Sequence, residues 1–145
     1  MKVEIKLSNE IKEPYAIIFT DKITDEIQKA IETLENQSSS LIILKNKHKI
    51  FIKSIEEIFM VQSANNQVIV YDKNEKYTSN KRLYELEKIL GENFFRISKS
   101  TIINIKEIDN VIPLFKGIMH VKMKNGLESN ISRKYLPTFK KHIGL

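Results

Sequence analysis

Two runs of apolar residues near the start of the chain have the pattern of β-strands. Residues 2–7, KVEIKL, alternate strictly between polar and apolar side chains, which predicts a strand with one buried face. Pro14 interrupts the chain before residues 15–20, YAIIFT. This continuous apolar run predicts a second strand.

A helical pattern follows the second run. Its apolar side chains recur at helical spacing on one face, and these positions are Ile23, Ile27, Ala30, Ile31 and Leu34. Asp21 or Thr24 can cap a helix that reaches about Asn36. The polar residues 36–40 then indicate a short linker. A β-β-α head of this size cannot hold a core alone, so we expect residues 1–40 to pack on another surface.

From Leu41 onward the pattern becomes that of a β protein. Short apolar runs are separated by turns rich in Lys, Asn and Asp. The predicted strands are 41–45, 49–53, 58–61, 68–71, 76–79, 95–97, 101–104, 111–115, 118–123 and 127–131. Asn125-Gly126 predicts a hairpin with a type I′ turn, and Lys116-Gly117 predicts another tight turn.

Two helices interrupt or follow these strands. Asn80 can cap a helix that ends at Leu90, with Gly91 as its stop signal. A short basic helix is expected at the C-terminus, with Pro137 in its first turn. The fold class is therefore mainly β, α+β overall. We expect an antiparallel sandwich or elongated β fold in residues 41–145, preceded by the β-β-α head.

The net charge changes sign at the same boundary, between residues 40 and 41. Residues 1–40 carry 5 Lys and 8 Asp and Glu, a net charge of −3, whereas residues 41–145 carry 19 Lys and Arg and 10 Asp and Glu, a net charge of +9. A basic body suggests a polyanionic partner, although lysine-rich solvated surfaces give the same excess. The chain has no Cys, no apolar run that could span a bilayer and no signal-peptide pattern, so a cytoplasmic location is expected.

Patterns typical of enzymes and metal sites are absent. His48, His120 and His142 are far apart and lack the spacing of metal ligands. No glycine-rich phosphate loop occurs, and neighbouring acids such as Glu56-Glu57 point in different directions. We therefore expect no catalytic residues, no metal, no cofactor and no small-molecule substrate.

The most informative stretch is residues 94–108, FFRISKSTIINIKEI. Between its apolar residues lies Ser98-Lys99-Ser100-Thr101, which is small, polar and cationic. Hydroxyl and ammonium groups in such a turn can donate hydrogen bonds to phosphates, and lysine can reach a guanine edge. Taken alone, the stretch is explained better by ordinary turn chemistry than by a nucleic-acid site.

The same stretch resembles the central motif of LytTR DNA-binding domains. Residues 55–62, IEEIFMVQ, resemble that family's opening strand, and residues 81–90 resemble its inserted helix. Residues 130–135, NISRKY, resemble its closing element. The resemblance covers about 105 residues in the right order. It implies a mainly antiparallel β fold that reads successive major grooves with loops. LytTR domains commonly follow a receiver domain, whereas here only a short head precedes the motifs, as in stand-alone bacterial regulators.

The resemblance also implies which residues read DNA. Arg133 of the closing element and Lys99 of the central turn are base-contact candidates, and a bidentate arginine suits guanine. The loop after the opening strand supplies Asn65, Asn66 and Gln67 as joint candidates, although a polar hairpin tip explains them equally well. Lys99 and Arg133 should then share one surface.

Further positions are candidates for contacts with the DNA backbone. These are Ser98, Ser100, Lys81, Arg82, Lys116, Lys134, Lys140 and Lys141. Asn104 is expected to be structural, hydrogen-bonding the backbone of a turn.

The predicted function is sequence-specific binding of double-stranded DNA by a transcription regulator. Repeated half-sites and a homodimer are expected, and the acidic head could dimerise or bind a membrane or protein partner. One alternative is an interaction module whose basic β body binds an acidic protein. Another is single-stranded RNA binding by an OB-like barrel, which needs exposed aromatic platforms. The phenylalanines here mostly occupy core positions, which disfavours that alternative.

Overall fold

The computed structural model describes residues 1–35 and 41–145. Its contacts divide the chain into two compact units, Met1–Gln37 and Ser38–Leu145. The linker predicted at residues 36–40 lies outside the described residues. In the described part of the chain, no helix is both long enough and apolar enough to cross a membrane.

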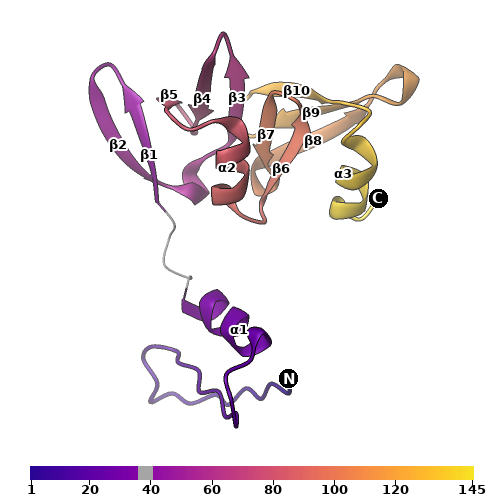
Figure 1. The fold of residues 1–145 in the computed structure, drawn as a ribbon. Coiled ribbons are helices and arrows are strands. Elements are labelled where there is room, and N and C mark those ends of the chain that lie inside the picture. The colour runs from indigo at the N-terminus through magenta and orange to yellow at the C-terminus, as the bar shows by residue number, and fades with distance from the viewer. Residues whose placement is uncertain (36–40) are drawn as a thin grey trace. The chain divides into compact units, whose positions relative to one another are not determined.

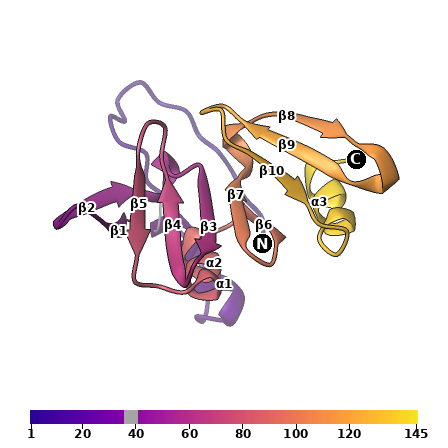
Figure 2. The same cartoon turned by 90° about the horizontal axis from the view of Figure 1, so that it is seen from above.

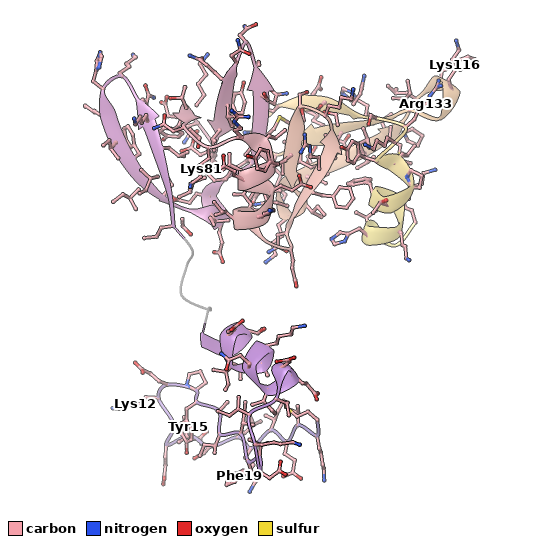
Figure 3. The ribbon with its side chains drawn as sticks, viewed as in Figure 1. Lys12, Tyr15, Phe19, Lys81, Lys116 and Arg133 are labelled. Atoms are coloured by element: carbon pink, nitrogen blue, oxygen red, sulfur yellow. The ribbon has the colours of Figure 1, made fainter. Side chains whose placement is uncertain are left out.

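The first unit contains one helix, α1 (Asp25–Glu35), among its described residues. Thr24 caps it, since its Oγ1 accepts a hydrogen bond from the Ile27 amide at 3.3 Å. The two strands predicted at residues 2–7 and 15–20 are wrong, because neither segment pairs with another strand. Their apolar side chains are exposed, including Tyr15 at 73% and Phe19 at 92%, both labelled in Figure 3.

The second unit is built on a seven-stranded antiparallel sheet (Figure 1), with the order β2-β1-β5-β4-β3-β7-β6. Its strands are β1 (Leu41–Asn46), β2 (Lys49–Ser54), β3 (Met60–Ala64), β4 (Gln67–Tyr71), β5 (Lys76–Ser79), β6 (Phe94–Ser98) and β7 (Thr101–Asn104). The strand predicted at 58–61 begins two residues later, because residues 55–57 form a 3₁₀ turn.

One face of this sheet is covered by α2 (Leu83–Leu90). A core forms between them from alternate strand residues and the apolar stripe of the helix, including Leu44, Val61, Val70, Leu86 and Ile102. On β1 and β2 the opposite face is exposed and apolar, formed by Leu41, Ile43, Ile50 and Ile52. The cap predicted at Asn80 is wrong. The helix begins after Arg82, whose amide donates to Glu85 Oε1 at 3.2 Å.

A smaller sheet, in the order β10-β9-β8, forms the other part of this unit (Figure 2). Its strands are β8 (Ile108–Pro113), β9 (Met119–Met123) and β10 (Glu128–Ile131), and α3 (Leu136–Ile143) follows. A second core joins this sheet and α3 to β3, β6 and β7, with Met60, Ile97, Ile103, Val121 and Phe139 among its residues. The mainly β, antiparallel fold class and both helices of residues 41–145 are confirmed.

A buried cluster around Asp72 connects the two sheets. Asp72 Oδ2 accepts hydrogen bonds from the Tyr77 hydroxyl at 2.9 Å and Lys53 Nζ at 3.1 Å, and Oδ1 accepts from the Glu75 amide at 2.7 Å. Asn125 Nδ2, in the turn between β9 and β10, donates to the Asp72 carbonyl at 2.9 Å. Burial alone raises the pKa of the Asp72 carboxyl, but the hydrogen bonds it accepts outweigh burial and lower that pKa below its ordinary value.

The turn between β9 and β10 differs from its prediction. The hairpin is confirmed, but Asn125 does not have the positive φ of a type I′ turn, and Gly126 has a φ of 90°. The Gly126 amide donates to the Met123 carbonyl at 3.0 Å and the Met123 amide donates to Leu127. These bonds close a three-residue loop in which glycine takes the left-handed position. The tight turn at Lys116 is confirmed, with a φ of 63°.

Candidate nucleic-acid interface

The hairpin between β3 and β4 presents amide side chains at its tip. Asn65 and Asn66 have φ values of 50° and 62° and form a two-residue turn between the paired residues Ala64 and Gln67. Both asparagines are exposed. Asn tolerates the left-handed region better than most residues, so this sequence suits the turn and leaves two amide groups in solvent.

The turn between β6 and β7 is held in shape by Arg96. Its Nε donates to the Ser98 carbonyl at 3.0 Å, and Nη2 donates to the Lys99 carbonyl. Nη1 pairs with Glu87 of α2 at 3.0 Å. The Ser100 amide also donates to Ser98 Oγ at 3.2 Å. The bond from Arg96 to residue 99 uses its backbone carbonyl, and the side chain of Lys99 is exposed.

Backbone hydrogen bonds bring three candidate segments to one end of the second unit. The Ser63 amide donates to the Ser100 carbonyl at 2.8 Å, which places the β3–β4 tip beside the β6–β7 turn. The Ser132 amide donates to the Ile97 carbonyl at 2.8 Å, which places the segment after β10 beside the same turn. Residues near 65, 99 and 133 therefore lie on neighbouring segments, although they are far apart in sequence.

Arg133 lies in the short segment that enters α3. The Ser132 carbonyl accepts hydrogen bonds from the Tyr135 and Leu136 amides, both at 3.0 Å, which fixes this turn. Arg133 itself is exposed and makes no ion pair within residues 41–145. Lys134 lies 5.5 Å from the centre of the Tyr135 ring, so its aliphatic stem is held against the protein.

The other cationic candidates are more scattered. Lys81 and Arg82 follow Ser79, which pairs with Val68 near the β3–β4 tip. Figure 3 draws Lys116 and Arg133 at the same end of the second unit. Lys140 and Lys141 do not join this group.

The course of α3 separates its lysines from the other candidates. The helix begins beside Ile97 and has His142 against Phe95, with ring centres 5.5 Å apart. It therefore runs along β6 away from the turn that carries Lys99, and its C-terminal end lies on the other side of the unit from the hairpin tips in Figure 1.

Asn104 has the structural role expected of it. It is buried, its Nδ2 donates to the Ile58 carbonyl at 2.9 Å, and its Oδ1 accepts from the Lys106 amide at 3.1 Å. These bonds fasten the end of β7 to the loop before β3. Among the residues that the structure describes, no group of His, Cys, Asp and Glu is arranged to hold a metal ion.

Arg96 is the residue of this region that sequence reasoning missed. The signal was present, since Arg96 follows the two phenylalanines of the central motif, but a lone arginine in a strand does not reveal its hydrogen-bond partners. The structure shows that it positions the turn while Lys99 stays exposed.

Comparison with known proteins identifies the family. The family model of the LytTr DNA-binding domain matches residues 48–144. The chain belongs to the LytTR family. The LytTR domain of this chain also matches a solved LytTr DNA-binding domain from Bacillus cereus, with a TM-score of 0.71 and 22% identity over 74% of this chain and 100% of that one.

Curated relatives extend the similarity to the head. An HTH-type transcriptional regulator of Staphylococcus aureus strain MSSA476 is 29% identical over 146 residues, covering 100% of this chain and 99% of that protein. Another HTH-type transcriptional regulator, from Staphylococcus aureus strain bovine RF122, is 30% identical over 146 residues, with the same coverage of both proteins. These matches support the conclusion that the chain is a DNA-binding transcription regulator. Despite the relatives' name, α2 and α3 are separated by five strands, so the described LytTR domain has no helix-turn-helix.

Proposed function

We propose that this LytTR regulator reads specific base pairs of duplex DNA with the three segments that meet beside the β6–β7 turn. The observation that supports this proposal most is the pair of backbone bonds Ser63–Ser100 and Ser132–Ile97, which gathers exposed amide and cationic side chains at one end of the sheets. Separate turns on a rigid β scaffold can enter separate stretches of a groove.

Each segment brings different chemistry to the bases. Arg133 offers a bidentate donor fork that matches guanine O6 and N7, and Lys99 can donate to the same acceptors. Asn65, Asn66 and Gln67 are joint candidates for adenine, to which an amide both donates and accepts. Ser98, Ser100, Lys81, Arg82, Lys116 and Lys134 are assigned to phosphates, with Lys140 and Lys141 as outlying candidates.

The sharpest test replaces Arg133 with Ala. A lost bidentate contact should weaken operator binding by about 1–3 kcal/mol and relax preference at one base position. Binding of the variant to a panel of single-base operator changes measures both effects. Arg82→Ala is the matched control, because losing a phosphate contact should weaken all sequences alike and reduce the salt dependence. An Arg133→Ala variant with unchanged base preference would contradict the assignment.

A competition experiment separates this function from its rival. A basic module that binds an acidic protein would hold DNA only through charge, so it should show no preference among duplexes. A regulator should keep its operator when mixed-sequence competitor DNA is in excess. Loss of the complex at the same competitor concentration for every labelled duplex would favour the interaction module.

The regulator is further proposed to act in the cytoplasm as a homodimer on repeated half-sites. Two copies spaced by about one helical turn would lie on one face of the DNA. Residues 1–35 supply exposed apolar side chains that could join the copies. A membrane or protein partner of these residues is the other proposed role.

A further inference from the structure

The turn between β1 and β2 has a backbone that its side chains do not favour. Lys47 and His48 have φ values of 45° and 66°, and they form a two-residue turn between the paired residues Asn46 and Lys49. Turns with two positive φ angles strongly prefer Asn-Gly, because a β-carbon is crowded in the left-handed region. Lysine is therefore a poor choice for the turn itself, and His48 stands where such a turn most often has glycine. Strained backbone of this kind is often retained where the side chains have a function.

The same hairpin carries an unbalanced positive charge. Residues 41–54 contain four lysines and no Asp or Glu. Lys53 pairs with Asp72 at 3.1 Å, but Lys45, Lys47 and Lys49 have no ion-pair partner in the described part of the chain. The three lysines around the turn therefore form a local site of positive potential, which favours an anionic ligand.

This charge is continuous with the candidate interface. Lys45, Lys47 and His48 line one hollow of the surface together with Gln67 and Lys76, and Glu75 is the one acidic residue of its lining, so cations still predominate there. Gln67 is the last of the three base-contact candidates of the β3–β4 hairpin, so the hollow reaches the edge of the candidate interface. Figure 1 shows the tips of the β1–β2 and β3–β4 hairpins on the same side of the second unit.

We propose that the Lys47-His48 turn is an additional phosphate-binding site, which extends the DNA interface beyond the β3–β4 hairpin onto the flanking duplex. A lysine ammonium is a compact point charge that suits a phosphate oxygen, and an imidazole N–H can donate to the same group. The site adds affinity and salt dependence without reading sequence. This inference rests on the proposed function, because it needs a duplex already held by the neighbouring segments.

The test exchanges the turn for the sequence that its backbone prefers. The double variant Lys47→Asn, His48→Gly removes both side chains. Asn-Gly is the sequence that this type of turn prefers, so the turn should be kept and the Tm of the variant should equal or exceed that of the wild type. Lys88→Asn, on the last turn of α2, is the control for losing one charge. Binding of all three proteins to a mixed-sequence duplex of about 30 bp is measured from about 50 to 200 mM salt, since phosphate contacts need no operator.

We expect the turn variant to lose one unit of counterion release. Its slope of log K against log salt should be shallower by about 0.9, so over this range the wild type loses roughly three to four times more affinity than the variant. Lys88→Asn should keep the wild-type slope. If the turn variant also keeps that slope, the phosphate site is wrong while the proposed function stands. If the wild type shows no salt-dependent duplex binding, the proposed function fails with it.

Discussion

The two units of this chain contain similar proportions of apolar residues but bury them to very different extents. Residues 1–34 bury a single side chain, Ile27, and expose most of their other large apolar residues. The LytTR domain instead places its apolar residues in two cores, one on each side of the large sheet. It also holds the buried polar residues of the described chain, Asp72, Thr101 and Asn104. The difference teaches that an apolar strand pattern becomes a β-strand only where a partner strand is present, whereas the helical pattern of the head forms α1 with little to cover it.

Core truncation should give the largest contrast between the units. Leu86 of α2 is 0% exposed, so Leu86→Ala should destabilise the LytTR domain by about 2–5 kcal/mol through lost burial and a cavity. Ile17 of the head is 66% exposed, so Ile17→Ala should change stability by less than about 0.5 kcal/mol. Urea unfolding of both variants measures these values. A large loss for Ile17→Ala would mean that the head is covered in solution, and the comparison would break.

The Asp72 cluster should give an intermediate effect that depends on pH. Asp72→Asn leaves Lys53 without its counter-charge and should destabilise the LytTR domain by about 1–3 kcal/mol at neutral pH. Because the folded-state pKa of Asp72 is lowered, its contribution is present above the unfolded value near 3.9 and is lost as pH falls through the folded-state pKa.

The acid side of the stability profile provides the control for this effect. The gap between wild type and Asp72→Asn should shrink as pH falls below about 4. Glu92→Gln removes an exposed carboxylate and should stay within about 0.5 kcal/mol of the wild type. If the difference in unfolding free energy between wild type and Asp72→Asn stays constant through the acid range, Asp72 does not contribute as the structure indicates.

Removing the head should have the smallest effect on stability. Residues 41–145 have their own cores, so deletion of residues 1–40 should shift their unfolding free energy by less than about 0.5 kcal/mol. If the head joins two copies, the same deletion should convert a dimer to a monomer, which is read from mass in solution. An unchanged oligomeric state would remove dimerisation from the head's proposed roles.

The contrast between the units also explains which parts of the fold the sequence predicts. In residues 41–145 each predicted strand has a neighbour in a sheet, with boundaries that move by a few residues. Strict alternation in residues 2–7 is as good a strand pattern as any of these, yet that segment has no partner strand. Local pattern reports which face a strand would bury, but it does not report whether another strand is available.

The sequence proposes which residues form the candidate site, and their roles stay predictions, but it does not reveal how the segments that carry them are arranged. The motifs around Lys99 and Arg133 are visible in the sequence, and Asn104 could be assigned a structural role. The backbone bonds that join residue 63 to 100 and 97 to 132 depend on strand order, which no local pattern contains. The Lys47-His48 turn was missed for a related reason. Its proposed role rests partly on a backbone conformation with positive φ, which the sequence of the turn does not announce.

The hydrogen bonds of Arg96 have a consequence for how this regulator could acquire new targets. The guanidinium of Arg96, which lies in β6 just before the turn, holds the carbonyls of Ser98 and Lys99, so the bonds that shape the loop do not involve the side chain at position 99. If Lys99 reads a base as proposed, substitutions at this position would alter the preferred base while the bonds from Arg96 to the backbone are kept. Divergence of operators between descendants of such a protein can therefore proceed by single steps that leave folding intact.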